Sequence, residues 1–309
     1  MKCVVTGGDG FIGSHVVDAL KEAGHSVLVV DINGEDVCQV DICDTKKLID
    51  VFNDYAPEVV FHIAGVANAR KALEDPVMAI NTNVAGTASV LEAARHTGSP
   101  RVILASTCWV CGAMKPGVVD EIEPFLPSGA GHTYTTSKLA SELLCHDFQQ
   151  LYGLPFTILR YGIPYGPRMW QGLVLRAFLD RAFAGKPLTI FGDGSASRRF
   201  VSVEDLARAH VLSLQDVAIN QTYNLEGMRA VSVKELAELI SRLFEGVEIE
   251  YRVEPTRAGE FQSSRRLITN SKAYIELGWE PAIDLEDGVR RTIEWYKANL
   301  ETLQVDLPK

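Results

Sequence analysis

Two periodicities of apolar residues alternate along the chain and predict an α/β fold. Short runs rich in β-branched residues are typical of buried strands, and longer segments with an apolar residue every three or four positions are typical of amphipathic helices. Strands that alternate with helices predict a parallel, doubly wound sheet. The strands expected in the first half are Val4–Val5, Ser26–Asp31, Glu58–Ile63, Arg101–Ala105 and Pro155–Arg160.

The alternation changes after Gly166 and Pro167. Helices expected at residues 172–184, 203–214 and 233–244 are separated by short strands such as Leu188–Phe191 and Thr222–Leu225. We therefore expect a first domain over residues 1–165 and a smaller α/β domain over residues 166–309, with some later segments returning to the first domain. Because ligands of doubly wound sheets bind at the carboxyl ends of the strands, the second domain is expected to bind the substrate there.

Composition and charge narrow the kinds of partner. The 309 residues carry a net charge of −10, which argues against nonspecific binding to nucleic acid or to an anionic membrane. No apolar run approaches a membrane span, and the first strand begins at residue 2 without room for a leader, so we expect a cytoplasmic protein. Cys108 and Cys111 form a single C-x-x-C without the second pair that a zinc site requires, so no metal is expected.

A glycine-rich turn follows the first strand directly. Gly7, Gly10 and Gly13 precede and enter a periodic segment whose first residues are Phe11 and Ile12. In such a turn the first glycine permits the bend, the second lets the backbone approach a pyrophosphate, and the third lets the helix pack close to the strand. The start of the helix then offers free N–H groups to the anion. The sequence therefore predicts the dinucleotide-binding turn of a Rossmann fold.

Acidic and amide side chains follow the second expected strand and a short strand expected at Val37–Val40. Asp31 ends the second strand, where a carboxylate can accept hydrogen bonds from the adenosine ribose and would repel a 2′-phosphate, which favours NAD over NADP. Asn33 is expected either to add a ribose contact or to belong to a turn. Asp41 is expected either to face the adenine or to cap a helix expected at Thr45–Phe52.

A tyrosine and a lysine four residues apart supply the candidate chemistry. Tyr134 and Lys138 lie at i and i+4, so they share one face of the helix expected over this segment. An ammonium beside a phenol is expected to stabilise the phenolate and to lower the pKa of the tyrosine, which makes it a proton acceptor near neutral pH. Thr107 follows the strand that ends at Ser106, and its hydroxyl can share a hydrogen bond with a substrate alcohol.

The glycine turn, the acid, the threonine, the tyrosine and the lysine occur in an order that resembles a known superfamily. The chain resembles the extended short-chain dehydrogenases/reductases and, more narrowly, their NAD-dependent sugar-nucleotide epimerase/dehydratase family, over nearly its whole length. The segments that carry the resemblance are Thr6–His15, Asp41–Asp44, His62–Gly65, Asn83–Thr87, Ser106–Thr107, Tyr134–Lys138, Leu159–Pro167, Phe191–Gly194, Arg198–Asp205, Arg257–Glu260 and Leu277–Trp279.

The resemblance implies roles for further residues. It places Ala64 and Asn83 near the nicotinamide, and it adds Ile42 and Tyr161 to the residues beside NAD. Lys138 would hydrogen-bond the nicotinamide ribose and would also lower the pKa of Tyr134. Two arginines, Arg198 and Arg257, match residues that clamp the diphosphate of a nucleotide sugar, for which a bidentate guanidinium is suited.

The favoured function that the resemblance implies is inversion of C4 of a nucleotide sugar, with UDP-glucose and UDP-galactose as the default pair. Tyr134 would take the proton of the C4 hydroxyl while hydride moves to NAD, and return of the hydride to the other face of the 4-keto sugar would invert the centre. A UDP-uronate is the alternative substrate, because Arg176 or nearby groups could meet a carboxylate.

Other outcomes of the same chemistry remain as alternatives. Dehydratases and decarboxylases of the family carry acids directly after the catalytic threonine, where this chain has Cys108 and Trp109, and we expect Trp109 to pack against a sugar face or to fill the pocket wall. A reductase that releases its cofactor is less favoured because Asp31 disfavours NADPH. A non-catalytic NAD-binding protein is the third possibility.

Excess apolar residues on two long helices indicate self-association. The helices expected at Pro76–His96 and His132–Leu151 carry apolar residues on more than one face. Such helices suggest a symmetric helix-bundle interface, so a homodimer is expected, with a buried monomer core as the alternative.

Overall fold

The computed structural model describes residues 1–115, 117–126, 130–253 and 266–299, and the chain divides into two compact units. Each unit is assembled from segments that are separate in the sequence. The first unit consists of Met1–Gly162, Leu206–Leu225 and Arg266–Glu280, and the second of Ile163–Asp205, Glu226–Arg265 and Pro281–Lys309. Within the described ranges, no helix is long and apolar enough to cross a membrane.

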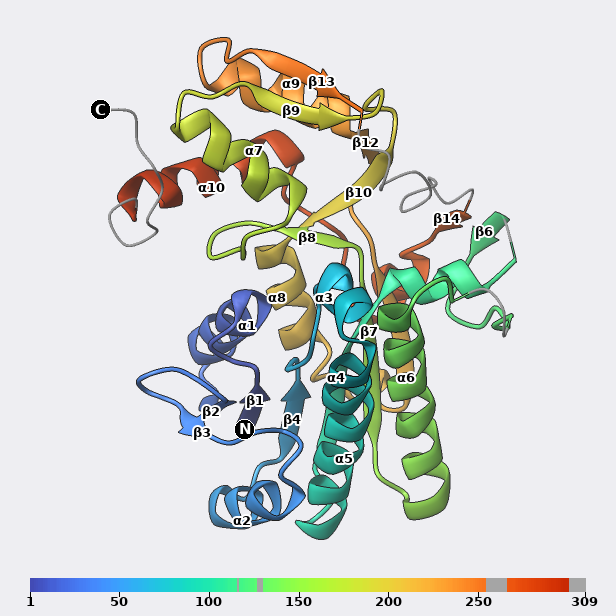
Figure 1. Ribbon diagram of the computed structural model, residues 1–309. Helices are drawn as coiled ribbons and strands as arrows, with labels where there is room; N and C mark the ends of the chain where they lie inside the picture. The colour runs from blue at the N-terminus through green and yellow to red at the C-terminus, as the bar shows by residue number, and fades with distance from the viewer. Residues whose placement is uncertain (116, 127–129, 254–265, 300–309) are drawn as a thin grey trace. The chain divides into compact units, whose positions relative to one another are not determined.

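A parallel sheet of seven strands forms the centre of the first unit, in the order β11-β7-β5-β4-β1-β2-β3 (Figure 1). The chain runs outward from β1 through β2 to β3 and then returns to β4 on the other side of β1, so the strand order reverses between β1 and β4. Ligands of doubly wound sheets bind at this reversal point. The strands are β1 (Lys2–Thr6), β2 (Ser26–Asp31), β3 (Cys38–Gln39), β4 (Val59–His62), β5 (Arg101–Thr107), β7 (Phe156–Tyr161) and β11 (Gln221–Leu225).

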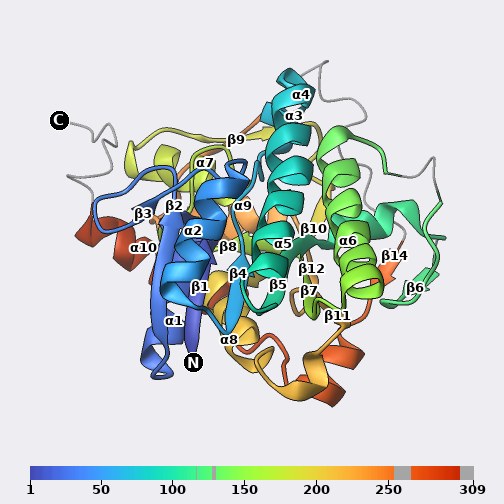
Figure 2. The ribbon, with the colours of Figure 1, turned by 90° about the horizontal axis from the view of Figure 1, so that it is seen from below.

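Helices α2 (Thr45–Tyr55), α5 (Gly86–His96) and α6 (Thr133–Tyr152) cover one face of this sheet. Phe52, Leu91 and Cys145 from these helices join apolar residues of the strands in one buried cluster. Figures 1 and 2 both draw α5 and α6 side by side. Apolar residues of alternate strand positions meet these helices, which is the physical origin of the periodicities in the sequence.

Helix α1 (Phe11–Glu22) follows β1 and buries Val16, Val17 and Leu20. Helix α8 (Val203–Leu212) brings His210 against Phe61 of β4, with ring centroids 5.9 Å apart. The neighbouring residue Val60 points to the cluster on the other face. The first unit therefore has a Rossmann-type doubly wound architecture, as the sequence predicts.

The long helix expected at Pro76–His96 is interrupted by a π-helical turn. Helix α4 (Pro76–Ile80) is capped by Asp75, whose carboxylate accepts the N–H of Met78 at 2.9 Å, and the π turn η1 (Asn81–Ala85) joins α4 to α5. A π turn widens the helix by one residue and redirects a side chain, and such turns are frequent at functional sites. Here the turn carries Asn83, which is buried.

The remaining elements of the first unit are short. A two-stranded parallel sheet pairs β6 (Gly117–Val119) with β14 (Arg266–Ile268). The other elements are α3 (Ala69–Glu74), the 3₁₀ helices η2 (Cys108–Ala113) and η3 (Asp216–Ala218), and the π-helical turn η5 (Ala273–Leu277).

The second unit is a smaller α/β assembly. One sheet has the order β12-β10-β8, and a second sheet pairs β13 with β9. Ser232 and Glu235 form a capping box at the start of α9, which fixes where that helix begins. The elements are β8 (Ile163–Tyr165), α7 (Val174–Phe183), β9 (Leu188–Phe191), β10 (Ser197–Ser202), β12 (Ala230–Ser232), α9 (Val233–Leu243), β13 (Ile249–Arg252) and α10 (Leu285–Ala298).

Candidate active site

The glycine turn after β1 is packed too closely for side chains. Gly7 has a φ of 71°, and a Cβ added there would lie 2.7 Å from the main chain of Ala64. A Cβ added to Gly13 would lie only 1.9 Å from the carbonyl oxygen of Gly7. The start of α1 therefore rests directly on the turn, as the spacing of the glycines predicts.

The start of α1 offers main-chain donors. Gly10 is the N-cap and supplies no side-chain acceptor, while its own N–H donates to Gly7 O at 3.2 Å and its carbonyl accepts the N–H of Ser14 at 2.9 Å. The first N–H groups of a helix have no partner inside the helix, so Phe11 and Ile12 can present theirs to an anion. The turn thus has the open cradle and donor set that fit a dinucleotide pyrophosphate.

Asp31 lies beside the glycine turn at the end of β2. One carboxylate oxygen accepts the N–H of Asp9 at 3.1 Å, and the other accepts the N–H of Ile32 at 2.8 Å. These bonds hold a negative charge next to the turn, where the ribose of a dinucleotide would lie. Asn33 is exposed in the bend that follows.

Asp41 and Ile42 follow β3 and have different surroundings. Asp41 accepts the N–H of Cys43 at 2.9 Å, whereas the N-cap of α2 is Asp44, which accepts the N–H of Lys47 at 3.1 Å. The helix-cap role considered for Asp41 is therefore wrong, because α2 begins at Thr45 and its cap is Asp44. Ile42 is buried in the core, where its side chain approaches Gly86 of α5.

Thr107, Tyr134 and Lys138 are brought together between β5 and α6. The hydroxyl of Thr107 hydrogen-bonds the phenol of Tyr134 and also accepts the N–H of Trp109 at 3.2 Å. Lys138 is buried, and its Nζ donates to the carbonyl of Ala105 at 2.9 Å. The three side chains singled out from the sequence therefore converge on the carboxyl end of β5.

Burial decides the protonation of the tyrosine and the lysine. It raises the pKa of Tyr134 to about 12, against the lowering effect of the Thr107 hydrogen bond. It lowers the pKa of Lys138 to about 8, against the raising effect of the Glu142 carboxylate. The expectation that the ammonium lowers the phenol's pKa is wrong for the protein alone, since desolvation outweighs it and the lowering contribution comes from Thr107.

The loop after β4 is tied to the same place by Asn83. Its Oδ1 accepts the N–H of Val66 at 2.7 Å, and its Nδ2 donates to the hydroxyl of Ser137 at 2.8 Å. The N–H of Ala64 donates to Thr6 O at 2.9 Å, so both ends of this loop are fixed. A Cβ on Gly65 would lie 3.5 Å from Lys138 Nζ, which shows that the loop passes beside the lysine.

Tyr161 lies on β7 opposite Thr107 in the strand register. Nδ1 of His210 lies 2.8 Å from the carbonyl of Leu206 and must donate to it, so Nε2 accepts the hydroxyl of Tyr161 at 2.7 Å. That hydroxyl is therefore engaged inside the first unit, and the ring and main chain of Tyr161 are what remain for a cofactor.

Two aromatic rings, those of Trp109 and His132, lie beside the ring of Tyr134. Trp109 meets His132 and Tyr134 edge to face, with ring centroids 5.0 and 6.0 Å away, and His132 lies nearly parallel to Tyr134 at 6.0 Å. His132 also caps α6 through Nδ1, which accepts the N–H of Thr135 at 3.2 Å. His132 was not singled out from the sequence, although it stands two positions before Tyr134.

One of the two arginines expected to hold a diphosphate, Arg198, belongs to the second unit. Arg198 lies half-buried on β10, where its Nη1 donates to Ser197 O at 2.6 Å, and burial lowers its pKa. Arg257 lies outside the described residues.

Arg176 is already paired. It is buried on α7, where its Nε donates to the carboxylate of Asp180 at 2.7 Å and its Nη1 donates to Met169 O at 3.1 Å. Its guanidinium also lies 4.7 Å from the ring centroid of Tyr296. The expectation that Arg176 could meet a substrate carboxylate is therefore wrong, because its charge is compensated inside the unit.

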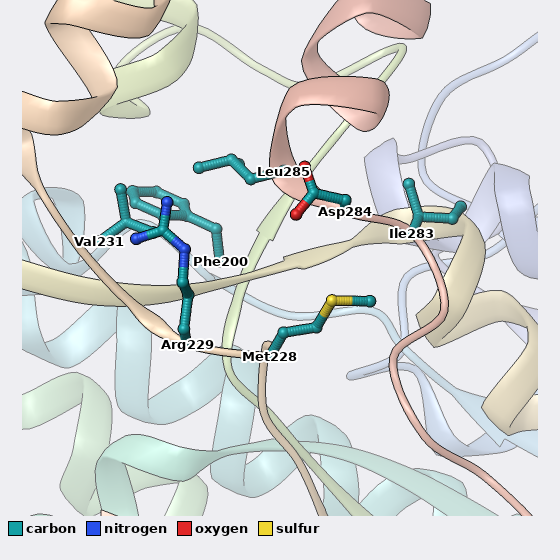
Figure 3. Close-up of a pocket in the computed structure, with 7 residues that line it drawn as sticks. All are labelled: Phe200, Met228, Arg229, Val231, Ile283, Asp284 and Leu285. Carbon is teal, nitrogen blue, oxygen red and sulfur yellow. The ribbon is translucent and has the colours of Figure 1, made fainter.

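A small hollow lies between β10, β12 and the start of α10 in the second unit (Figure 3). It has room of about 10 Å³, the space of roughly one water molecule, so it cannot hold a nucleotide sugar. Arg229 on its rim is paired with Glu235 at 3.2 Å. The lining residues are Phe200, Met228, Arg229, Val231, Ile283, Asp284 and Leu285.

No group of three or more His, Cys, Asp or Glu side chains that could hold a metal ion occurs within the ranges that the structure covers. Cys108 is buried beside Thr107, and its thiol donates to Arg160 O at 3.2 Å. Cys108 and Cys111 are both in the thiol form rather than joined in a disulfide.

Comparisons with known proteins agree with this architecture. The profile of the NAD dependent epimerase/dehydratase family matches residues 3–225. The chain is 30% identical to a UDP-glucuronate 4-epimerase of Thermodesulfobacterium geofontis, over 97% of this chain and 98% of that protein. It is 31% identical to a dTDP-glucose 4,6-dehydratase of Neisseria gonorrhoeae, over 96% and 95% of the two chains.

A solved structure gives the same picture for the fold. The UDP-glucose 4-epimerase of Thermotoga maritima, determined with UDP-glucose, superposes with a TM-score of 0.85 at 31% identity, covering 97% of this chain and 100% of that one. The chain therefore belongs to the NAD dependent epimerase/dehydratase family.

Proposed function

We propose that the protein is an NAD-dependent 4-epimerase of a nucleotide sugar, with UDP-glucose and UDP-galactose as the first pair to test. The observation that carries this proposal is the Thr107–Tyr134 hydrogen bond, formed beside the buried ammonium of Lys138. It supplies a proton acceptor for a sugar hydroxyl, a second hydroxyl for the same oxygen and a neighbouring positive charge. The names of the relatives support the same chemistry.

Each of the three side chains has a separate task in this proposal. Tyr134 takes the proton of the C4 hydroxyl and later returns it, and Thr107 hydrogen-bonds the same oxygen. Lys138, which is positive below a pH of about 8, would favour the phenolate over the phenol in the complex with NAD and the sugar. Bound NAD would supply the acceptor for the hydride that leaves C4 of the sugar. It would also supply a positive charge beside the phenol.

The residues that would hold NAD are those of the glycine turn and the ends of β2 and β4. Gly7, Gly10 and Gly13 with the first N–H groups of α1 would hold the pyrophosphate. Asp31 would accept the ribose hydroxyls and would repel the 2′-phosphate of NADP. The loop that Asn83 fixes, together with Ala64 and Lys138, would contact the nicotinamide half.

Epimerisation is favoured over dehydration by the residues that follow Thr107. A dehydratase must remove a C5 proton and expel water, which requires a further acid or base. Here Cys108 donates to a carbonyl inside the fold, and Trp109 packs its indole against His132 and Tyr134. Neither side chain can act as a carboxylate, so we propose that Trp109 forms a wall of the sugar site.

Two classes of sugar are candidates, a hexose and a uronate. UDP-uronates stay a candidate because one relative is a UDP-glucuronate 4-epimerase, although the pairing of Arg176 removes the carboxylate partner first considered. Arg198 and Arg257 are proposed to clamp the diphosphate. These two arginines make no distinction between a hexose and a uronate.

A homodimer through α4 and α6 is also proposed. Val90 and Leu91 of α5 are buried in the core, but Leu143 and Leu151 of α6 and Val77 of α4 are exposed by more than half. Exposed leucine and valine side chains on neighbouring helices are suited to a symmetric interface.

The test is incubation of the purified protein with UDP-, GDP- and TDP-sugars, without added reductant, followed by chromatographic separation of the products. The proposal predicts that one pair of C4 epimers interconverts in both directions. Net consumption of NADH, or a product that has lost water or carbon dioxide, would instead identify a reductase, dehydratase or decarboxylase.

A further inference from the structure

One face of α6 carries a third ionisable residue besides the proposed catalytic pair. Tyr134, Lys138 and Glu142 follow one another at intervals of four residues, so they form a line along the helix. The three side chains each contact a residue at the end of β5: Tyr134 reaches Thr107, Lys138 reaches the Ala105 carbonyl, and Glu142 reaches Ser106. The line thus fixes the register of the helix against the strand.

Glu142 is the most strongly held of the three. Its side chain is buried, and one carboxylate oxygen accepts the hydroxyl of Ser106 at 2.5 Å and Nε of Arg160 at 3.0 Å. Its other oxygen accepts Nη2 of Arg160 at 2.8 Å. Because Ser106 on β5 and Arg160 on β7 are register partners, a single carboxylate ties α6 to two adjacent strands.

Arg160 is not free to serve another partner. Its guanidinium lies 5.3 Å from the ring centroid of Phe125, and its Nη1 finds no hydrogen-bond acceptor among the residues that the structure describes. A buried ion pair with this many hydrogen bonds is costly to break, since either charge left alone would be uncompensated.

Other titratable groups interact with Lys138, Glu142 and Arg160 from the neighbouring elements. His62 of β4 is uncharged because burial lowers its pKa to about 3, and burial raises the pKa values of Tyr161 and Cys145. Among the residues that the structure describes, Glu142 is the one group that acts to raise the pKa of Lys138. Among the described residues these groups are His62, Cys108, Cys111, Glu121, Tyr134, Cys145, Arg160 and Tyr161.

We propose that Glu142 is the positioning residue of this site: its buried carboxylate fixes α6 on β5 and β7 and supplies the negative charge that holds the ammonium form of Lys138. It acts through Lys138 and does not touch the substrate. A buried ammonium without a counter-charge tends to lose its proton, and a neutral Lys138 would no longer favour the phenolate of Tyr134. The inference deepens the proposed function but can be tested on the protein alone.

The experiment is an NMR titration of the full-length protein labelled with ¹³C at the lysine ε-carbon, with the Lys138 signal assigned from Lys138→Met. In Glu142→Gln the pKa of Lys138 is expected to fall by at least about one unit, a tenfold change in its protonation constant. Glu142→Asp keeps the charge and should restore most of the wild-type titration. Glu92→Gln, which removes a half-buried carboxylate on α5, is the matched control and should leave Lys138 unchanged.

A second variant covers the case in which Glu142→Gln does not fold, because it leaves Arg160 charged and buried. Glu142→Gln/Arg160→Gln removes both charges and keeps groups that can hydrogen-bond each other, and Lys138 should still titrate below its wild-type value. An unchanged Lys138 titration in either folded variant overturns the inference.

Activity is the second readout. In Glu142→Gln the alkaline limb of the kcat profile should move to lower pH together with the Lys138 titration, with KM little changed. If the titration moves but the wild-type protein converts no nucleotide sugar, the proposed function fails while the role of Glu142 toward Lys138 stands. If the wild-type protein is active and the limb stays in place while kcat falls, Glu142 is a structural residue only.

Discussion

The hydroxyl of Thr107 hydrogen-bonds the phenol of Tyr134, which joins the end of β5 to the first turn of α6. The bond lowers the pKa of a phenol that burial otherwise raises to about 12. Two elements far apart in the sequence thus present two hydroxyl groups to one place. The proposed proton transfer depends on this arrangement.

Removal of the Tyr134 hydroxyl is expected to abolish turnover without unfolding the protein. In Tyr134→Phe the Thr107 hydroxyl still accepts the N–H of Trp109, so the local structure has a remaining anchor. Because general acid–base catalysis contributes about 10²- to 10⁴-fold, kcat should fall by at least about 100-fold. Steady-state kinetics measure the loss, and Tyr152→Phe, an exposed tyrosine at the other end of α6, should keep wild-type activity. Near-normal turnover of Tyr134→Phe would exclude the proposed mechanism.

The charge of Asp31 is expected to set the preference for NAD. In Asp31→Asn the amide oxygen can still accept the N–H of Asp9, but the negative charge that would repel a 2′-phosphate is lost. The ratio of the NADP and NAD dissociation constants should therefore fall by about tenfold or more, about 1.4 kcal/mol. Calorimetric titration of both cofactors measures the ratio, and Asp36→Asn in the following loop serves as the charge-matched control. An unchanged ratio would show that Asp31 does not face the adenosine ribose.

Two buried histidines are expected to make the protein acid-sensitive. Burial lowers the pKa of His62 to about 3 and that of His210 to about 4, while the ordinary value in an unfolded chain is about 6.5. The unfolded chain therefore binds more protons than the folded one between these values, so stability falls as the pH falls from about 6.5 toward 4. For each pH unit by which the solution is acidified in that window, each histidine should lower the free energy of unfolding by about 1.4 kcal/mol.

Urea unfolding at several pH values between 7 and 4.5 measures this slope. A free energy of unfolding that does not depend on pH in this range would contradict the burial of His62 and His210 as neutral rings.

The proposed dimer face can be tested at its most central exposed leucine. Leu143 on α6 is 53% exposed, so Leu143→Glu should fold normally as a monomer. Burying an unpaired carboxylate in a helix interface is costly, and dissociation is the expected outcome. Light scattering after size-exclusion chromatography measures the mass. Val217→Glu, which is 46% exposed on η3, is the control and should keep the wild-type mass. A wild-type monomer would refute the interface.

Local patterns were sufficient to predict much of the fold. The two apolar periodicities identify most strands and helices of the first unit because alternate strand positions and one helix face are buried against each other. The glycine turn was also predictable, since the 1.9 Å approach at Gly13 leaves no room for a side chain. The π turn at Asn83 was not, because the segment keeps an ordinary helical pattern of apolar residues.

The electrostatics of the site required the tertiary structure. The i, i+4 spacing identified Tyr134 and Lys138, but the direction of the tyrosine's pKa shift depends on burial, which no spacing reveals. Glu142 pairs with Arg160, 18 positions away on another element, and this pairing becomes visible only when α6 lies on β7. Arg176 is a different case, because its partner Asp180 lies at i+4 on the same helix, a spacing that the sequence itself contains.

Transfer of hydride from C4 and back to C4 is the central claim, and an isotope experiment tests it most directly. The purified protein is incubated with UDP-glucose or UDP-glucuronate carrying deuterium at C4, without added reductant, and the products are analysed by NMR and mass spectrometry. The account predicts that the C4 epimer forms with its deuterium retained at C4 and with no change in mass. Formation of the epimer with deuterium lost to water, or a product lighter by water or carbon dioxide, would contradict it.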